Sequence, residues 1–475
     1  MPGIRQGVCG SLEPNAGTVA GSKCVITLPN LTKAGNALAA VVWLTGQTAP
    51  ITISISDDQS NANWAQAVNN NPTGNESYQA WLCTNIAAGT KVITVTPTLA
   101  MGGQIHVKIF EMWGVSTSVV SSALDGTSSG TSTTSTVSSG SITPTQSGDL
   151  LFQFGLDTGD NVTTSLTKGS GWTLAAAQLV DGICAQYQVY NSVSAITPSF
   201  TKSGPATTYV TLAMAIKAQS GAGDSTMVNG SCRYIQHHWM PDSVSSRTLQ
   251  FPCTGNCIVI SVSHGNNTVT LNTPTDGNSN TYTVDVHATA SPFTYVAIAH
   301  ADNATTSTDL ANLVVAFSSA PNDALNAMII VHDMVGMKSP ALGATKTASG
   351  TQGSPGGNLT TVASFVPNSG GHSCVVLSGG IDSHTCQTLL AGTAWEWHTT
   401  DMWIPEEDGA NDHLDEADPF GLVYTSDTSS QSFVFSTNAA NTNGVQDWAA
   451  VAAEFLAAPS TTPAQHPIWP ILVRK

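Results

Sequence analysis

The sequence predicts an all-β protein built from tandem β-sandwich or jelly-roll-like repeats, and three observations support this prediction. Apolar and hydroxyl side chains alternate in residues 51–56 (ITISIS), 91–96 (KVITVT) and 268–271 (TVTL), which is the period-two pattern of a strand with one buried face. Only 9% of the 475 residues are charged, and Ser, Thr, Asn and Gly, which favour turns and strands over helices, are abundant instead. The third observation is an internal repetition of landmarks.

Four segments share one order of landmarks. Each begins with a polar turn and an apolar strand, continues to an aromatic residue after a second polar turn, and closes with a long apolar stretch. The aromatic residues are Trp64, Trp172, Tyr282 and Trp395, and subtraction of their numbers gives spacings of 108, 110 and 113 residues. The expected opening strands are 37–44, 150–156, 257–263 and 373–378, and the closing stretches are 104–115, 209–218, 324–337 and 445–458.

The segments are further related in pairs. The first and third carry an Asp-led turn six residues before the aromatic, at Asp58 and Asp276, whereas the second and fourth open with low-complexity polar runs, 126–147 and 343–357. We therefore expect a first pair over 1–220 (halves 1–118 and 119–220), a second pair over 221–458 (halves 225–338 and 339–458) and an extended arm over 459–475. The composition of 219–226 predicts a short flexible linker. Each pair could be one jelly-roll-like unit or two sandwiches.

One closing stretch is ambiguous. Residues 445–457 (VQDWAAVAAEFLA) are rich in alanine and could form a helix by propensity. They occupy the same place in their segment as 105–110, which alternate like a strand. We therefore expect a strand, because tertiary pairing often overrides propensity.

The motifs of the first segment resemble a β-sandwich repeat that is common in bacterial surface proteins and phage virion proteins. They are the Gly35-Asn36 turn with its apolar strand, the Asn-rich turn from Asp58 to Trp64, residues 88–95 (AGTKVITV), and 110–114 (FEMWG). The third segment matches in part, and the second and fourth match in outline. The resemblance implies a fold and brings no catalytic residues with it. It leaves attachment, decoration and glycan binding open.

The charge balance excludes several partner classes. The formal net charge is −17, and binding to nucleic acid or to an anionic membrane needs clustered cations instead. No run of about 18 apolar residues is present, so we expect no membrane insertion. The first residues, MPGIRQ, lack the features of a secretory signal, which fits either a removed signal or release by cell lysis, as for a virus particle.

Nine cysteines leave at least one without an intramolecular partner. We expect three candidate disulfide pairs, Cys9–Cys24, Cys253–Cys257 and Cys374–Cys386, of which the last would face each other across a hairpin. Buried reduced thiols are the equally weighted alternative. Zinc held by Cys374 and Cys386 with His372 and His384 is disfavoured, because the spacing matches no known zinc fold.

The acidic stretch 401–418 holds 8 of the 31 acidic residues. Oxygen ligands crowded in a loop suit calcium, which makes Asp408, Asn411, Asp412 and Asp415 candidate ligands. Their order does not match an EF-hand, and a solvated acidic loop is the favoured interpretation, with no cofactor.

Two tryptophans near this loop, Trp397 and Trp403, are candidate glycan-stacking residues, whereas Trp395 is expected in the core. The arm carries four prolines and ends in an apolar tip with Trp469, Ile471 and Leu472, which we expect to pack on its own domain or on a neighbouring subunit.

These observations favour a non-enzymatic structural protein on a virion or an extracellular surface, specifically a phage capsid decoration, tail or fibre component. Its partners would be copies of itself and other virion or surface proteins, and glycans in addition. A bacterial adhesin or carbohydrate-binding protein is the first alternative, and a glycan-active enzyme using the acidic loop is the second. No P-loop or dinucleotide motif occurs in the chain.

Overall fold

The computed structural model describes residues 1–12, 24–44, 51–71, 76–98, 105–157, 165–176, 183–203, 208–240, 243–290, 294–305, 310–321, 327–352, 358–368, 373–381, 386–390, 396–398, 420–425, 428–437 and 446–459. These residues form 31 strands and one helical turn, α1 (Val120–Ala123), so the all-β prediction is confirmed. Among them, no helix is long and apolar enough to cross a membrane.

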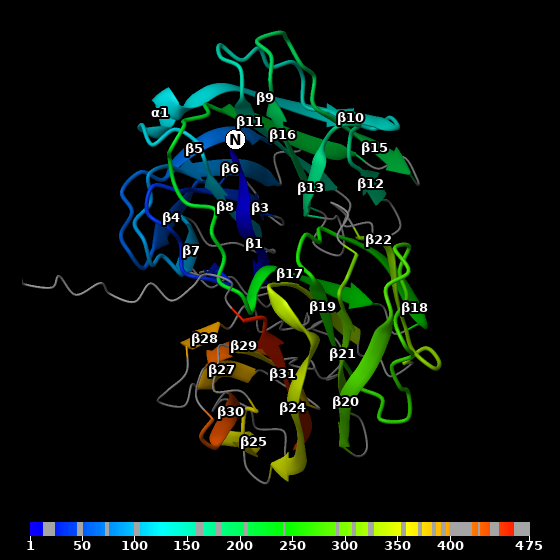
Figure 1. Cartoon of the computed structure of the whole chain (residues 1–475). Coiled ribbons are helices and arrows are strands. Elements are labelled where there is room, and N and C mark those ends of the chain that lie inside the picture. The colour runs from blue at the N-terminus through cyan, green and yellow to red at the C-terminus, as the bar shows by residue number, and fades with distance from the viewer. Residues whose placement is uncertain are drawn as a thin grey trace, which may run out of the picture.

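The strands fall into four groups along the chain, each with five strands in one large sheet and a smaller sheet beside it (Figure 1). In group one the large-sheet strands are β1 (Gly3–Leu12), β8 (Ile105–Trp113), β3 (Ala37–Leu44), β6 (Ser77–Cys83) and β5 (Ala65–Asn70), and the small sheet is β2 (Cys24–Thr27), β7 (Val92–Pro97) and β4 (Ile53–Asp57). In group two they are β9 (Leu124–Ser132), β16 (Tyr209–Ile216), β11 (Asp149–Asp157), β14 (Ile183–Tyr190) and β13 (Thr173–Ala176), with β10 (Thr136–Ser138), β15 (Ser199–Ser203) and β12 (Ser165–Thr167).

Groups three and four follow the same plan. Group three has β17 (Ser231–Met240), β23 (Ala327–Val335), β19 (Cys257–His264), β21 (Thr294–Asp302) and β20 (Tyr282–Ala290), with β18 (Ser246–Phe251) and β22 (Leu310–Ala316). Group four has β24 (Met337–Gln352), β31 (Gln446–Ala457), β26 (Ser373–Ile381), β29 (Phe420–Thr425) and β28 (Glu396–His398), with β25 (Asn358–Phe365), β30 (Gln431–Thr437) and β27 (Cys386–Leu390). In every group, the large-sheet strand that comes first in the chain pairs with the large-sheet strand that comes last. That last strand pairs on its other side with the second large-sheet strand of the chain. That the groups descend from one repeated unit stays a prediction.

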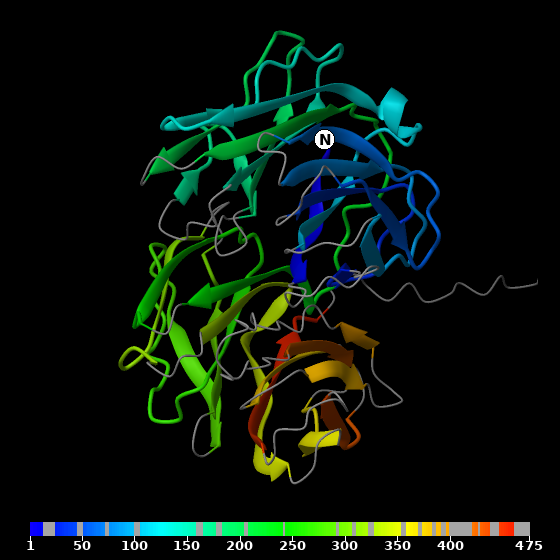
Figure 2. The same cartoon turned by 180° about the vertical axis from the view of Figure 1, so that it is seen from behind.

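A parallel strand pair joins groups one and three. Strands β1 and β17 run side by side with Gly7 opposite Tyr234 and Val8 opposite Ile235, which fuses the two large sheets into one of ten strands. The other two large sheets pack on opposite faces of this sheet, group two above and group four below (Figures 1 and 2). Each pair of groups is therefore two sandwiches that meet through their large sheets.

Strand β3 shows why the sequences of some strands are unbroken apolar runs without alternation. Its alternate residues Ala37, Ala39, Val41 and Trp43 enter the core shared with group two, and Leu38, Ala40, Val42 and Leu44 enter the core under the small sheet. Both faces of the strand are buried, so period-two alternation gives way to ALAAVVWL. The aromatic landmarks follow: Trp172 and Tyr282 are buried and Trp64 is half-buried, whereas Trp395 lies outside the described residues.

The two ambiguous sequence features have definite structures. Residues 446–457 form β31, so the strand prediction for this alanine-rich stretch is confirmed. The low-complexity runs 126–147 and 343–357 overlap the first strands β9 and β24, which begin two and six residues before them. Gly130 is required within β9, because a Cβ there would collide with the carbonyl oxygen of Ser138.

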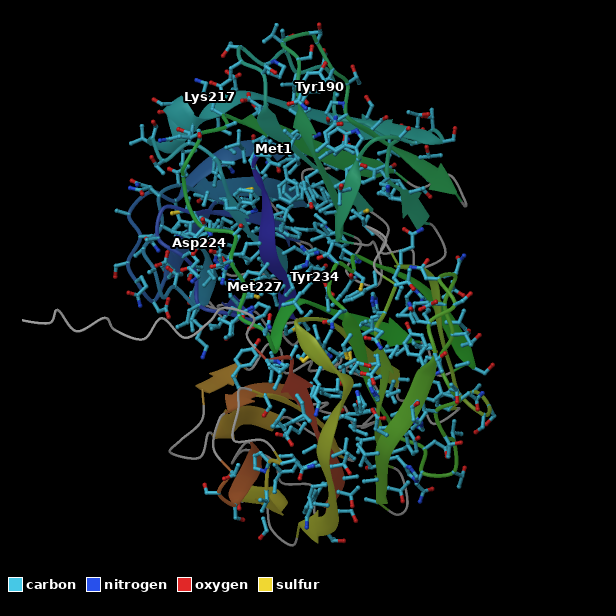
Figure 3. The ribbon with its side chains drawn as sticks, in the orientation of Figure 1. Met1, Tyr190, Lys217, Asp224, Met227 and Tyr234 are labelled. Carbon is cyan, nitrogen blue, oxygen red and sulfur yellow. The ribbon has the colours of Figure 1, made fainter. Side chains whose placement is uncertain are left out.

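Residues 219–226 connect group two to group three, as expected, but hydrogen bonds attach them to group one. The amide of Gln219 donates to the Gly114 carbonyl at 2.9 Å, and the Gly114 amide donates to the Ala222 carbonyl at 2.9 Å. Asn36 and Asp224 exchange two further hydrogen bonds. The segment from Lys217 to Met227 runs beside group one on its way from group two to group three (Figure 3), where these bonds hold it in place.

Candidate functional site

Buried charge is concentrated where the first and last strands of each large sheet meet. An extra residue interrupts the pairing there, at Arg5 in β1, Asp125 in β9 and Arg233 in β17. In β24 the pairing with β31 is irregular twice, between Met337 and Leu342 and between Leu342 and Thr345, and the second irregularity covers Gly343 and Ala344 opposite Glu454. Such β-bulges redirect a side chain and often occur beside functional residues, which makes the four positions candidate sites.

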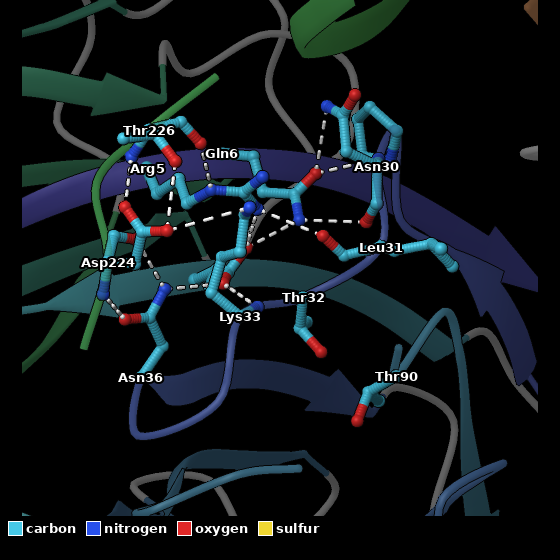
Figure 4. A network of polar contacts seen from close by, with 12 residues as sticks. Arg5, Gln6, Asn30, Leu31, Thr32, Lys33, Asn36, Thr90, Asp224 and Thr226 are labelled. Carbon is cyan, nitrogen blue, oxygen red and sulfur yellow. Dashed lines mark hydrogen bonds and ion pairs between the residues drawn. The ribbon is translucent and has the colours of Figure 1, made fainter. Parts of the chain in front are cut away.

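In group one the bulge carries a buried ion pair. Nη1 of Arg5 lies 2.5 Å from Oε2 of Glu111, which also accepts a hydrogen bond from Gln6 Nε2 at 2.5 Å (Figure 4). Oε1 of Glu111 accepts from the Lys33 amide at 2.9 Å and from Asn36 Nδ2 at 2.5 Å. Arg5 is 4% exposed and Glu111 is 0% exposed. Four donors of this chain therefore occupy the carboxylate.

The same network connects groups that are distant in sequence. Arg5 Nε donates to the Thr226 carbonyl at 3.0 Å, and Asn30 Nδ2 donates to the Cys232 carbonyl at 2.5 Å. The Tyr424 hydroxyl donates to the Pro29 carbonyl at 3.0 Å and accepts from the Cys232 amide at 3.0 Å. Hydrogen bonds thus link group one to the segment after group two, to group three and to group four.

Asp333 takes the equivalent position in group three. Its Oδ2 lies 2.9 Å from Arg233 Nε and accepts from the Thr254 amide at 3.1 Å, while Oδ1 accepts from the Gly255 amide at 2.8 Å. A Cβ at Gly255 would collide with the Met334 carbonyl oxygen, so only glycine lets the backbone approach this carboxylate.

Glu454 takes this place in group four. It accepts from the Ala344 amide at 3.0 Å, the Asn368 amide at 2.7 Å and the Ser373 hydroxyl at 2.9 Å. The carboxylate is fully buried, and these donors come from the bulge and from the loop that precedes β26.

Group two reverses the arrangement, because the acid stands on the bulge itself. Asp125 accepts from the amides of Thr145 and Gln146 and from the Thr145 hydroxyl. Burial opposes ionisation of Asp125, but hydrogen bonds from Thr145, Asp149 and Gln146 outweigh it and lower its pKa. Burial, together with the neighbouring Asp125, raises the pKa of Asp149 to about 6.

The four carboxylates share one structural role. Each accepts a backbone N–H from the loop that leads into the next large-sheet strand, at Lys33, Thr145, Gly255 and Asn368. A buried backbone donor without a partner costs free energy, so these acids stabilise the loops. Asp125 and Asp149 are two neighbouring carboxyl groups, but both are buried. A glycosidase pair needs two carboxyl groups that face an open cleft.

A second charged cluster lies between groups three and four. His300 Nδ1 lies 2.7 Å from Asp285 Oδ2, and its Nε2 lies 3.5 Å from Asp302 Oδ1. Burial opposes protonation of His300, but Asp285 outweighs it and the pKa is raised. The ring packs on Phe455 at 5.5 Å, so the cluster supports an interface between sheets. Among the described residues, no three His, Cys, Asp or Glu side chains are arranged to hold a metal ion.

Most of the sequence-predicted site residues lie outside the described residues. These are Asp408, Asn411, Asp412, Asp415, Trp403, Trp469, Ile471, Leu472, and the zinc alternatives His372 and His384. Trp397 belongs to the edge strand β28, opposite Val423, and its side chain is likewise outside the description. The calcium, glycan and assembly-arm interpretations therefore stay predictions.

The disulfide candidates are corrected where the structure describes them. Cys253, Cys257 and Cys374 are free, buried thiols, and Cys24 is buried as well. Cys253 and Cys257 cannot close a loop, because their side chains enter cores on opposite faces of the ten-stranded sheet.

The hairpin proposed for Cys374 and Cys386 is also wrong. Strand β26 lies in the large sheet of group four and β27 lies in its small sheet, so the two strands are not paired. The side chains of Cys9 and Cys386 lie outside the description.

Burial predicts how the thiols react. It raises the pKa of Cys83 to about 12 and those of Cys232, Cys257 and Cys374 well above the ordinary value, so few reactive thiolates form at neutral pH. We expect iodoacetamide to label these four cysteines slowly in the native protein and fully in denaturant, as mapped by peptide mass spectrometry. Rapid native labelling of Cys83 would contradict this burial.

In group one the Asp-led turn is organised one residue earlier than the sequence suggested, whereas in group three the acid is Asp276, as expected. In group one the organising acid is Asp57, whose Oδ1 accepts from the Asn61 amide at 3.1 Å and whose Oδ2 accepts from Trp64 Nε1 at 2.8 Å. Asp276 similarly accepts from the Asn280 amide and from the Tyr282 hydroxyl. The shared signal is Asp-x-x-x-Asn, with the acid four residues before the asparagine in both turns.

Sequence reasoning also missed the role of the buried acids. In the sequence, Glu111 stands out only as part of the closing motif 110–114 (FEMWG). The usable signal was a single acid inside an apolar strand, as in FEMW, HDMV and AEFL. Comparison with known proteins adds no further assignment, because no protein-family model and no curated protein matches the chain.

Proposed function

We propose that the chain is a non-enzymatic structural protein of an extracellular assembly, specifically a virion component that serves as a capsid decoration, tail or fibre protein. The observation that supports this proposal best is the use of the buried charged groups. The carboxylates of Glu111, Asp333 and Glu454 each accept hydrogen bonds from donors of the chain itself. These bonds maintain the fold, so the carboxylates are not available to contact a substrate.

The arrangement of the groups supports the same proposal. Four sandwiches are joined by the parallel β1–β17 pair and by the hydrogen bonds of Asn30 and Tyr424. Connections of this kind give a rigid body with large outer surfaces, which suits a building block. The acidic and apolar segments 401–418 and 459–475 would then supply attachment.

Fractionation of particles tests this proposal. We expect the chain to co-sediment with virus particles in a density gradient of the producing culture, and to be detected on them by immunogold electron microscopy. Recovery only in the soluble fractions or on the cell surface would contradict the virion assignment and favour a bacterial adhesin.

Glycan binding is the second candidate, and the position of Trp397 on the edge strand β28 favours it over enzyme activity. A glycan array compares the wild type with Trp403→Ala and Trp397→Ala. Binding that both variants lose would support a stacking surface, and binding to no glycan would contradict it.

A further inference from the structure

Two first strands have a hydrogen-bonding edge that no described strand occupies. In all four groups the first strand ends the five-strand order of its large sheet, and β1 and β17 use their outer edges to pair with each other. In the part of the chain that the structure describes, β9 pairs only with β16 and β24 pairs only with β31.

The composition of these edges favours pairing. Exposed edges are ordinarily protected by lysine, proline or inward-pointing charges. Residues 126–132 of β9 (GTSSGTS) contain no charge and no proline, and the one acid of this strand, Asp125, is buried in the bulge. Thr127, Ser129 and Thr131 are exposed. In β24, Lys338 and Pro340 stand at the beginning of the strand, before the bulge at Gly343, and residues 341–352, which would form the pair, contain one charge, the exposed Lys346.

We propose that β9 of one copy pairs in parallel with β24 of a second copy, in the way that β1 pairs with β17. Groups two and four stand to each other as groups one and three do, with the same strand order and a bulge at the same place. The molecule therefore contains its own precedent for joining two groups through their first strands.

The precedent also fixes a register. Gly7 lies two residues after Arg5 in β1, and Thr127 lies two residues after Asp125 in β9, so these two positions correspond. Tyr234 and Ala344 correspond in the same way, because each follows the extra residue of its bulge, Arg233 or Gly343, by one position. The observed Gly7–Tyr234 pairing then places Thr127 opposite Ala344, and two residues further it places Ser129 beside Lys346.

The location of the two edges determines the type of assembly. Strand β9 lies across the top of the molecule in Figure 1, whereas β24 runs from the centre to the lower end, so the two edges are different surfaces. A contact between different surfaces of identical copies is heterologous, and it produces a ring or a filament. This inference goes beyond the proposed function, because it names a second copy of the chain as the partner and specifies the strands.

Sedimentation velocity on the full chain, from about 1 µM to about 1 mM, tests the pairing over the range of weak affinities. We expect concentration-dependent association in the wild type. Ser129→Lys places a second cation beside Lys346 and should weaken association about two- to fivefold, since like charges directly opposite each other are destabilising. Adding Lys346→Glu to this variant restores an attractive pair and should recover the association.

Controls separate this effect from general electrostatics. Ser129→Lys makes a chain of net charge −17 less negative, which by itself would promote association. Ser194→Lys, on an exposed loop between β14 and β15, makes the same change of charge and should not weaken association. Circular dichroism verifies that each variant is folded.

Two results would overturn the inference. The first is a monomeric wild type at every concentration. The second is a loss of association in Ser129→Lys that Lys346→Glu does not recover, since it would exclude the β9–β24 register. A chain that co-sediments with virus particles but stays monomeric alone would retain the proposed function and lose this inference.

Discussion

Replacement of Glu111 by Ala is expected to lower the free energy of unfolding by about 3–5 kcal/mol, because it leaves a buried cation without its partner. Arg5 is 4% exposed, and the Lys33 amide and Asn36 side chain also lose their acceptor. Urea denaturation followed by fluorescence measures the change. If Glu111→Ala does not fold, Glu111→Gln, which keeps the shape and one acceptor, should show a smaller loss in the same direction.

An exposed ion pair nearby provides the control. Lys33 Nζ and Asp224 Oδ2 lie 3.5 Å apart, and their side chains are 37% and 42% exposed. Surface pairs of this kind contribute about 0–1 kcal/mol, so Lys33→Ala should change stability by no more than that. Equal losses in Glu111→Ala and Lys33→Ala would contradict the structural role assigned to the buried carboxylate.

Acidification is expected to destabilise the protein through two buried histidines. Burial lowers the pKa of His264 and of His332 to about 4, from an ordinary value near 6.5. The unfolded chain takes up a proton at each site as the pH falls through about 6.5, whereas the folded chain does so only near pH 4. Their contribution to stability is complete above pH 6.5, falls between pH 6.5 and 4, and amounts to about 3 kcal/mol per histidine.

Urea titrations at pH 7.5, 6, 5 and 4.5 measure this loss. The variant His264→Phe keeps an aromatic ring against Tyr295, whose centroid lies 4.9 Å from the histidine ring, but cannot titrate. Its stability should therefore depend less steeply on pH between 6.5 and 4. Asp149 and His300, whose pKa values are raised, act in the opposite direction in both proteins, so the difference between the proteins isolates His264. Identical pH profiles would contradict the shift.

The sequence was a good guide to features that depend on neighbouring residues. Period-two alternation predicted the strands, and the place of 446–457 within its segment correctly outweighed its alanine content. Alternation is a local signal, because it depends on adjacent side chains, whereas the strand assignment of 446–457 depended on comparison with the equivalent residues 105–110.

The errors concern relations between distant residues. The pairing of Gly7 with Tyr234 has no local signal, and neither has the attachment of residues 219–226 to group one. Composition suggested a flexible linker because it records only propensity. The Cys374–Cys386 hairpin was wrong for a similar reason: sequence proximity suggested a turn, whereas β26 and β27 belong to different sheets. For Trp403 and the acidic loop, the prediction depends on residues outside the described structure.

The β1–β17 pair also imposes an order on biosynthesis. Gly7 leaves the ribosome 227 residues before its partner Tyr234, by subtraction of their numbers. At roughly 5–20 residues per second, translation leaves the outer edge of β1 unpaired for roughly 10–45 s. Groups one and two can complete their shared core within that interval, so the nascent chain presents a folded domain with an open edge. The capture of that edge by β17 is a contact of high sequence separation, which is the kind of contact that forms slowly.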